Sequence, residues 1–251
     1  SGISGGLNLY AYANNNPLHW HDPDGRFAHI LWGAGIGAVF GGGSYLVECW
    51  ISGEEISWSR LAIRTATGAA TGAVAALTFG AGSSFLAAKG FSSLANAVLT
   101  GSMTGGVAGF AGGFLSTSAE GMLLDGRGIG DALLMGLAAG GRGAAIGVVG
   151  GAAGGAVFSQ VGATFLGSVV SGASGGAAGG GVAGAWQGYQ RHGLSLSMLH
   201  YAGSGALRGA AYGAAGGAAG WAAGRASGVI RPMKDYPGNL PKPGGLLVRT
   251  Q

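Results

Sequence analysis

The side chains that could do chemistry become scarce after residue 26. Seven carboxylates, three histidines and one cysteine remain there, and none has a metal-binding or redox spacing such as HExxH or CxxC. The run Gly126-Arg127-Gly128-Ile129-Gly130 lacks the Lys-Ser/Thr of a phosphate loop and follows no predicted strand. His19 and His21 flank Trp20 and are more typical of core or turn positions than of ligands. The sequence therefore predicts no metal, no cofactor and no enzyme active site after residue 26.

Two arginines stand out because each interrupts a long apolar run. Arg142 and Arg208 fall at near-equivalent places in two repeated segments. An arginine inside a membrane span usually faces the bundle interior or a water-filled path, and a path lined by arginines favours anions. Both residues are therefore candidates for lining a pore. The alternative, which we favour, is that both snorkel to a membrane interface.

The elements that must position these residues are rich in glycine. The chain has 58 glycines in 251 residues and only 9% charged residues, whereas a soluble domain carries roughly 7% glycine and 25% charge. A glycine inside a helix costs roughly 1 kcal/mol relative to alanine in water. In lipid the cost of unpaired backbone groups enforces the helix, and a glycine stripe lets two helices approach closely. The composition therefore indicates glycine-zipper helices that can enter a membrane.

The glycines recur at every fourth position, which places them on one face of a helix. We expect them to pack helix against helix. The packing glycines are Gly33, Gly37, Gly41, Gly105, Gly109, Gly113, Gly143, Gly147, Gly151, Gly172, Gly176, Gly180, Gly184, Gly209, Gly213 and Gly217.

Three short polar turns, around residues 52–57, 125–131 and 191–195, separate pairs of glycine-rich runs. The repeat predicts a mainly α fold of three helical hairpins, with Ser57, Asp131 and Ser195 as N-caps of the second arms. About 20 apolar residues suffice for one crossing of a bilayer. The six candidate spans are roughly 28–50, 59–80, 92–119, 132–157, 162–189 and 196–225.

Both ends of the chain differ from this helical domain, which we assign to residues 27–225. Residues 226–251 form a basic tail with several prolines. This tail suits a polar anchor at an anionic lipid surface or a solvated end, and it lacks the features of a nucleic-acid-binding module. Residues 1–26 are too short to bury a core, and we expect them to end a larger domain. The alternation over Leu7–Tyr12 and two turn signals predict a β-hairpin there.

The opening segment resembles the close of the Rhs/YD-repeat core. The resemblance rests on three motifs: GGLNLYAY at residues 5–12, Asn16-Pro17-Leu18, and Asp22-Pro23-Asp24-Gly25. In that family a β-rich shell ends in a DPxG motif and is followed by a variable C-terminal toxin. The resemblance implies that Asp22 takes part in self-cleavage of the parent protein between Arg26 and Phe27. Asp22 matches the second of the two aspartates that the family uses, and its partner is absent from this sequence. Arg26 stands where the family commonly has leucine.

Three functions are compatible with these observations. The first is a toxin domain that is delivered to a target cell and permeabilises its membrane, as a single chain or as a homo-oligomer in the bilayer. The second is a translocation module for a separate toxin, and the third is a soluble glycine-rich enzyme or binding domain. The family resemblance further implies a parent Rhs shell, a cognate immunity protein and a secretion apparatus, such as type VI, as partners in competition between bacteria.

Overall fold

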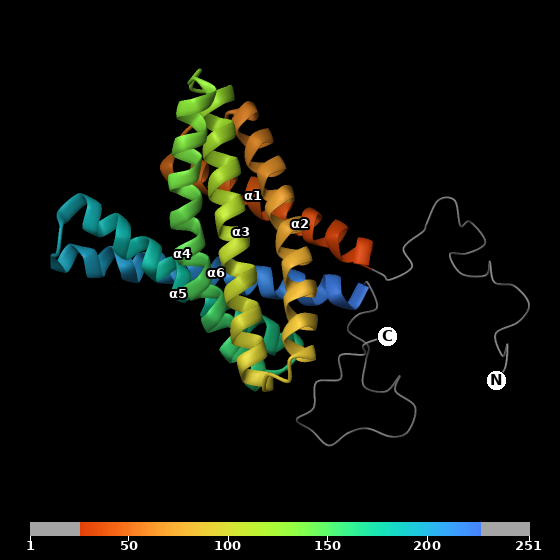
Figure 1. Ribbon diagram of the computed structural model, residues 1–251. Helices are drawn as coiled ribbons and strands as arrows, with labels where there is room; N and C mark the ends of the chain where they lie inside the picture. Colours follow the sequence, from red (N-terminus) through yellow and green to blue (C-terminus); the bar gives the residue numbers. More distant parts are fainter. Residues whose placement is uncertain (1–25, 227–251) are drawn as a thin grey trace, which may run out of the picture.

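The computed structural model describes residues 26–226, which form six α-helices (Figure 1). Within this range the chain contains no strand. The predicted β-hairpin of residues 1–26 and the basic tail lie outside the described residues, apart from Arg26 itself. The helices are α1 (Arg26–Ser52), α2 (Trp58–Ala88), α3 (Ser93–Leu123), α4 (Ile129–Val161), α5 (Phe165–His192) and α6 (Leu196–Ala226).

The predicted spans correspond one to one to these helices, because a charged or turn-forming residue interrupts the apolar run at each connection. Each connection contains one glycine with a φ between 63° and 74°. Residues with a side chain rarely adopt this left-handed conformation, which commonly ends a helix. The glycines in the connections therefore reverse the chain, whereas those in the helices serve packing. The five reversing glycines are Gly53, Gly90, Gly126, Gly162 and Gly193.

The three predicted N-caps differ in outcome. Ser57 precedes α2, and its hydroxyl accepts a hydrogen bond from the backbone N–H of Arg60 at 3.4 Å, as a cap should. Ser195 precedes α6. The prediction for Asp131 is wrong, because α4 begins two residues earlier and its N-cap is Gly128. Asp131 instead lies in the first turn of α4, where its negative charge suits the helix dipole.

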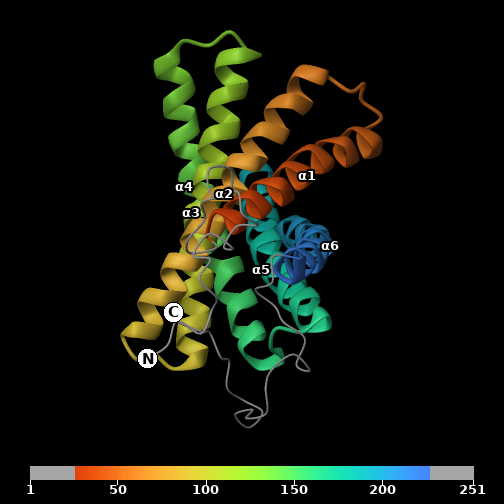
Figure 2. The same ribbon diagram turned by 90° about the vertical axis from the view of Figure 1, so that its right-hand side faces the viewer.

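Consecutive helices pair as three antiparallel hairpins: hairpin 1 is α1–α2, hairpin 2 is α3–α4 and hairpin 3 is α5–α6. Helix α3 also packs against α2, and α4 packs against α5. The hairpins do not form one parallel bundle. Helices α2, α3 and α4 stand side by side in Figure 1, whereas α6 crosses them at a steep angle and is seen almost end-on in Figure 2.

Three of the described helices are long and apolar enough to cross a membrane, judged by length and composition alone. They are the Ile30–Ser52 part of α1, α3 and α4. The sequence analysis predicts six membrane-competent helices, and this criterion supports three of them. Helices α2, α5 and α6 are long enough, but small and polar residues, including Arg60, Arg64 and Arg208, replace larger apolar ones.

The distribution of side chains is the reverse of that in an ordinary soluble domain. Among the described residues the buried apolar ones are Tyr45, Cys49, Leu86 and Ala132, whereas large apolar side chains are exposed along every helix. Trp50 is 84% exposed, for example, and Leu134 is 66% exposed. Leucine, isoleucine, valine and phenylalanine are normally the residues most often buried. In this chain the closest approaches between helices within each hairpin are made by glycine.

Candidate functional site: glycine interfaces and a polar seam

The interface within hairpin 2 is built from backbone atoms. Gly105 faces Gly147, and Gly109 faces Gly143, so that a methyl group added to any of the four would overlap the carbonyl oxygen of its partner. Such an approach is possible only between residues without side chains. Carbonyl oxygens then lie close to the facing Cα atoms, where weak Cα–H···O contacts become available.

The same geometry extends along hairpin 2 and recurs in the other two hairpins. In hairpin 3, Gly172, Gly176 and Gly180 face Gly213, Gly209 and Gly205. In hairpin 1, Gly33 and Gly37 face Gly72 and Gly68. The sequence predicts that these glycines pack helix against helix. In the structure each of them lies against the backbone of the other arm of its hairpin. The remaining pairs are Gly41 with Arg64, Gly113 with Ala139, Gly151 with Gly101, Gly184 with Tyr201 and Gly217 with Ser168.

A further glycine interface joins hairpin 2 to hairpin 3, and our sequence analysis did not identify it. Gly150 of α4 faces Gly175 of α5, and Gly154 lies against Ser171 and Gly175. The signal was present in the sequence, since Gly150/Gly154 and Gly175/Gly179 are also four residues apart. The spacing alone does not reveal which other helix a second row of glycines will contact.

The interface between α2 and α3 has a different character, because side chains fill it. The position of a methyl group on Gly112 of α3 would lie 3.3 Å from the hydroxyl oxygen of Thr71 on α2. A methyl group on Gly82 of α2 would lie 3.8 Å from the methyl group of Thr100 on α3. These two contacts fix an antiparallel register in which Thr104 is level with Thr78. In both contacts a glycine of one helix meets a threonine side chain of the other.

At one end of this interface the polar groups bond to one another across the two helices. The Asn96 amide of α3 donates to the carbonyl oxygen of Ser83 on α2 at 3.4 Å, and the Thr100 hydroxyl donates to the Asn96 side-chain oxygen at 3.0 Å. Thr100 is only 2% exposed. It is the largest fully buried side chain in the described part of the chain, and it is polar.

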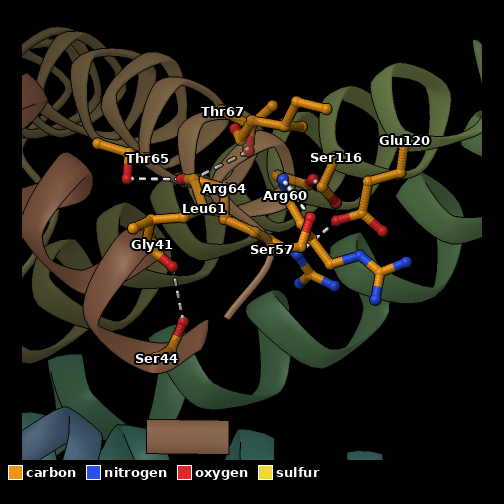
Figure 3. Close-up of polar contacts among 12 residues, drawn as sticks. Gly41, Ser44, Ser57, Arg60, Leu61, Arg64, Thr65, Thr67, Ser116 and Glu120 are labelled. Atoms are coloured by element: carbon orange, nitrogen blue, oxygen red, sulfur yellow. Dashed lines mark hydrogen bonds and ion pairs between the residues drawn. The ribbon is translucent and has the colours of Figure 1, made fainter. Parts of the chain in front are cut away.

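At the other end lies a charged cluster, shown in Figure 3. Arg64 of α2 forms an ion pair with Glu120 of α3, with 2.5 Å between Nε and the carboxylate oxygen. Arg60 and Ser116 lie beside this pair (Figure 3). The Arg60 Nε atom is buried and has no hydrogen-bond partner within residues 26–226. The cluster therefore combines two positive charges with one negative charge.

We call this set of residues the polar seam. On α3 its members recur every fourth residue, with Ala108 and Gly112 in the middle of the series. This regularity is visible in the sequence, one position before the glycine series 101, 105, 109 and 113. The polar seam comprises Asn96, Thr100, Thr104, Ser116 and Glu120 of α3, together with Arg60, Arg64, Thr67, Thr71, Thr78 and Ser83 of α2.

The two candidate pore-lining arginines are not brought together by this fold. Arg142 lies exposed on α4, where its Nε donates to the backbone carbonyl of Ala138 at 3.3 Å. Arg208 lies exposed on α6. Both therefore lie on the outer surface of the described helices.

The residues of the expected self-cleavage site are only partly covered by the structure. Asp22, His19 and His21 lie outside the described residues. The bond between Arg26 and Phe27 falls in the first turn of α1. In the described part of the chain, no three His, Cys, Asp or Glu side chains lie close enough together to hold a metal ion.

The outer surface of hairpin 2 and its neighbour α2 carries two open, shallow apolar grooves that meet at Met103. One runs between α3 and α4 beside Val107 and Phe110, and the other runs between α2 and α3 beside Leu77 and Phe85. Both grooves are lined mainly by apolar side chains, and the second also includes Thr78 of α2.

No family model, no curated protein and no solved structure matches the chain.

Proposed function

We propose that this chain is a membrane-active toxin domain that inserts into the bilayer of a target cell and permeabilises it. The observation that carries the proposal is the reversed distribution of side chains, with glycine backbone inside and large apolar side chains outside. In water such a surface would promote aggregation. Large exposed apolar patches usually mark protein-interaction or membrane surfaces. In lipid the same side chains are in their preferred solvent.

Hairpin 2 is the part best suited to insert first. It is the one hairpin in the described residues whose two arms both meet the apolarity and length criterion for a span. Its arms have 31 and 33 residues, which corresponds to about 45–50 Å of helix and exceeds the roughly 30 Å hydrocarbon layer. Its arms are held together mainly by glycine backbone, and the Ser118 hydroxyl between them is buried and donates to the carbonyl of Ala132.

The setting of this activity is proposed from the resemblance of residues 5–25 to the end of the Rhs core. The chain would be carried inside a parent Rhs shell and released by self-cleavage after Arg26, with Asp22 as one of the participating carboxylates. A secretion apparatus would deliver it, and a cognate immunity protein would protect the producer. A shell would also keep the apolar helices out of water before delivery.

A translocation module remains the second candidate, and one observation favours it. Helices α2, α5 and α6 are less apolar than the other three, and hairpin 3 lies across hairpin 2 rather than alongside it. A module that inserts only hairpin 2 would anchor in the membrane and leave other segments at its surface. Such a module binds and inserts without producing discrete currents of its own.

The test is the current across a planar lipid bilayer after addition of the full 251-residue chain. Discrete conductance steps are expected, together with release of a small dye from liposomes. Gly105→Ile should abolish both, because its side chain meets the backbone of Gly147, whereas Gly141→Ile should retain both, because the space around Gly141 is open. Membrane binding without current would favour translocation, and absence of binding would favour a soluble activity.

A further inference from the structure

We propose that the polar seam between α2 and α3 is the path along which small ions cross the membrane through this chain. This inference rests on the proposed membrane activity and assigns the conduction path to particular residues. It places the path between hairpins 1 and 2, away from Arg142 and Arg208.

The seam has the length that a transmembrane path needs. From Asn96 to Glu120 it runs along 24 residues of α3, which is about 36 Å of helix. The hydrocarbon layer of a bilayer is about 30 Å thick. Asn96 and Glu120 can therefore each lie near one boundary of the hydrocarbon layer, with hydroxyl-bearing residues of the seam between them.

The seam places polar groups where a purely structural interface would not need them. The neighbouring interfaces, α3–α4 and α4–α5, are built mainly on glycine, and their buried serines, Ser118 and Ser171, each donate a hydrogen bond to a backbone carbonyl. Along the seam, by contrast, the Thr104 hydroxyl oxygen is buried with no hydrogen-bond partner in residues 26–226. An unsatisfied buried hydroxyl has a free-energy cost, and polar residues at membrane depth usually mark ion or substrate paths. Water or an ion would satisfy it.

The hydroxyl groups on α2 can also face such a path. Thr67, Thr71 and Thr78 donate their hydroxyl hydrogens to carbonyl oxygens of their own helix, each at 2.8 Å. Their oxygen lone pairs remain available as acceptors. A row of such oxygens can replace part of the hydration shell of an ion.

The structure shows the seam closed, and its contacts explain how it opens. Hairpin 1 is held to hairpin 2 through side chains, including the Arg64–Glu120 ion pair and the bond from Asn96 to Ser83. Hairpin 2, in contrast, is held together by interlocked backbones. A displacement of α2 from α3 therefore exposes polar side chains on both helices while each hairpin stays intact.

The charged cluster at one end gives the path a mouth whose charge can be altered. Arg60 and Arg64 contribute two positive charges and Glu120 one negative charge. Removal of the Glu120 charge leaves an excess of positive charge and should favour anions. Removal of the Arg64 charge leaves Glu120 without its ion-pair partner and should favour cations. Opposite shifts from two partners of one ion pair would not follow from a loss of packing alone.

The experiment measures unitary conductance and reversal potential of the full chain in a planar bilayer under a KCl gradient. Thr104→Val and Thr100→Val keep the side-chain shape but remove the hydroxyl, and each should lower the conductance of single channels by roughly twofold or more. Thr65→Val is the matched control, because Thr65 lies on α2 but faces Gly42 of α1. It should leave the conductance unchanged.

The charge variants provide the second arm. Glu120→Gln should move the reversal potential toward the chloride equilibrium potential, and Arg64→Gln should move it toward that of potassium. The double variant should return close to the unmodified chain. If a threonine variant yields no channels at all, this arm decides the question.

The outcomes separate this inference from the function on which it rests. A chain that never conducts overturns both. A chain that conducts with unchanged conductance and reversal potential in all seam variants overturns the seam alone. If Arg142→Gln or Arg208→Gln shifts the reversal potential and the seam variants do not, the path instead runs between copies of the chain, along the outer surfaces of α4 and α6.

Discussion

The two faces of α3 carry the same four-residue spacing but form opposite kinds of interface. Toward α4 the series is Gly101, Gly105, Gly109 and Gly113, and the two backbones touch. Toward α2 the series runs from Asn96 to Glu120, and side chains separate the helices. A four-residue period therefore specifies that a face will pack, whereas the residues on it decide whether the contact is permanent or can open.

The two interfaces should also differ in strength and in response to substitution. A contact between two backbones cannot adjust to an added atom, because the backbone moves only when the whole helix moves. A side-chain contact can adjust by rotation. Substitutions on the two faces of α3 should therefore change the stability of the chain by different amounts. In each case the free energy of unfolding is measured in a mild detergent by titration with a denaturing detergent and followed by circular dichroism.

The largest effect is expected at the glycine face. Gly105→Ala places a methyl group on the carbonyl oxygen of Gly147, so that α3 and α4 must separate. We expect a loss of about 3 kcal/mol or more, at the upper end of the range for overpacking. A loss below about 1 kcal/mol would mean that the helices do not approach as closely as the structure has them.

The next effect is expected at the charged end of the seam. Arg64 and Glu120 are 38% and 23% exposed, which places their ion pair between surface pairs worth up to about 1 kcal/mol and buried pairs whose disruption costs about 3–5 kcal/mol. We expect Glu120→Gln to cost about 1–2 kcal/mol. A double-mutant cycle with Arg64→Gln checks this value, and zero coupling would contradict the pairing.

A glycine on an open face should show the reverse sign. Nothing lies within 4 Å of the position of an added methyl group on Gly141 of α4. Gly141→Ala should therefore stabilise the chain by up to about 1 kcal/mol through helix propensity alone. Destabilisation of the same size as at Gly105 would show that this surface is covered in solution, for example by a second copy.

The smallest effect is expected where a glycine meets the seam. A methyl group on Gly112 would lie 3.3 Å from the Thr71 hydroxyl oxygen and 3.4 Å from the Thr71 methyl group, so a small shift of this side chain accommodates it. The strain should roughly cancel the gain in helix propensity, so we expect Gly112→Ala to change the stability by less than about 1 kcal/mol. The difference between Gly112→Ala and Gly105→Ala, on one helix, is the sharpest measure of how the two faces differ.

The sequence by itself determined the helices and the hairpins. Helix positions follow from local features, since a charged or turn-forming residue ends each apolar run and a left-handed glycine reverses the chain. Pairing within a hairpin is also local, because a short connection leaves the second arm little choice of neighbour. The structure then sets the register by placing the glycine series of the two arms face to face, as with Gly105 and Gly147 or Gly109 and Gly143.

Only the tertiary structure decided how the hairpins meet. Every helix has more than one face, and a series such as Gly150/Gly154 or Thr100/Thr104 does not state which distant helix will cover it. The polar seam, the α4–α5 contact and the crossing of hairpin 3 all depend on this choice. The exposed positions of Arg142 and Arg208 depend on it too. Spacing fixes the direction of a side chain around its own helix axis, and the partner on that side is settled by the packing of the whole chain.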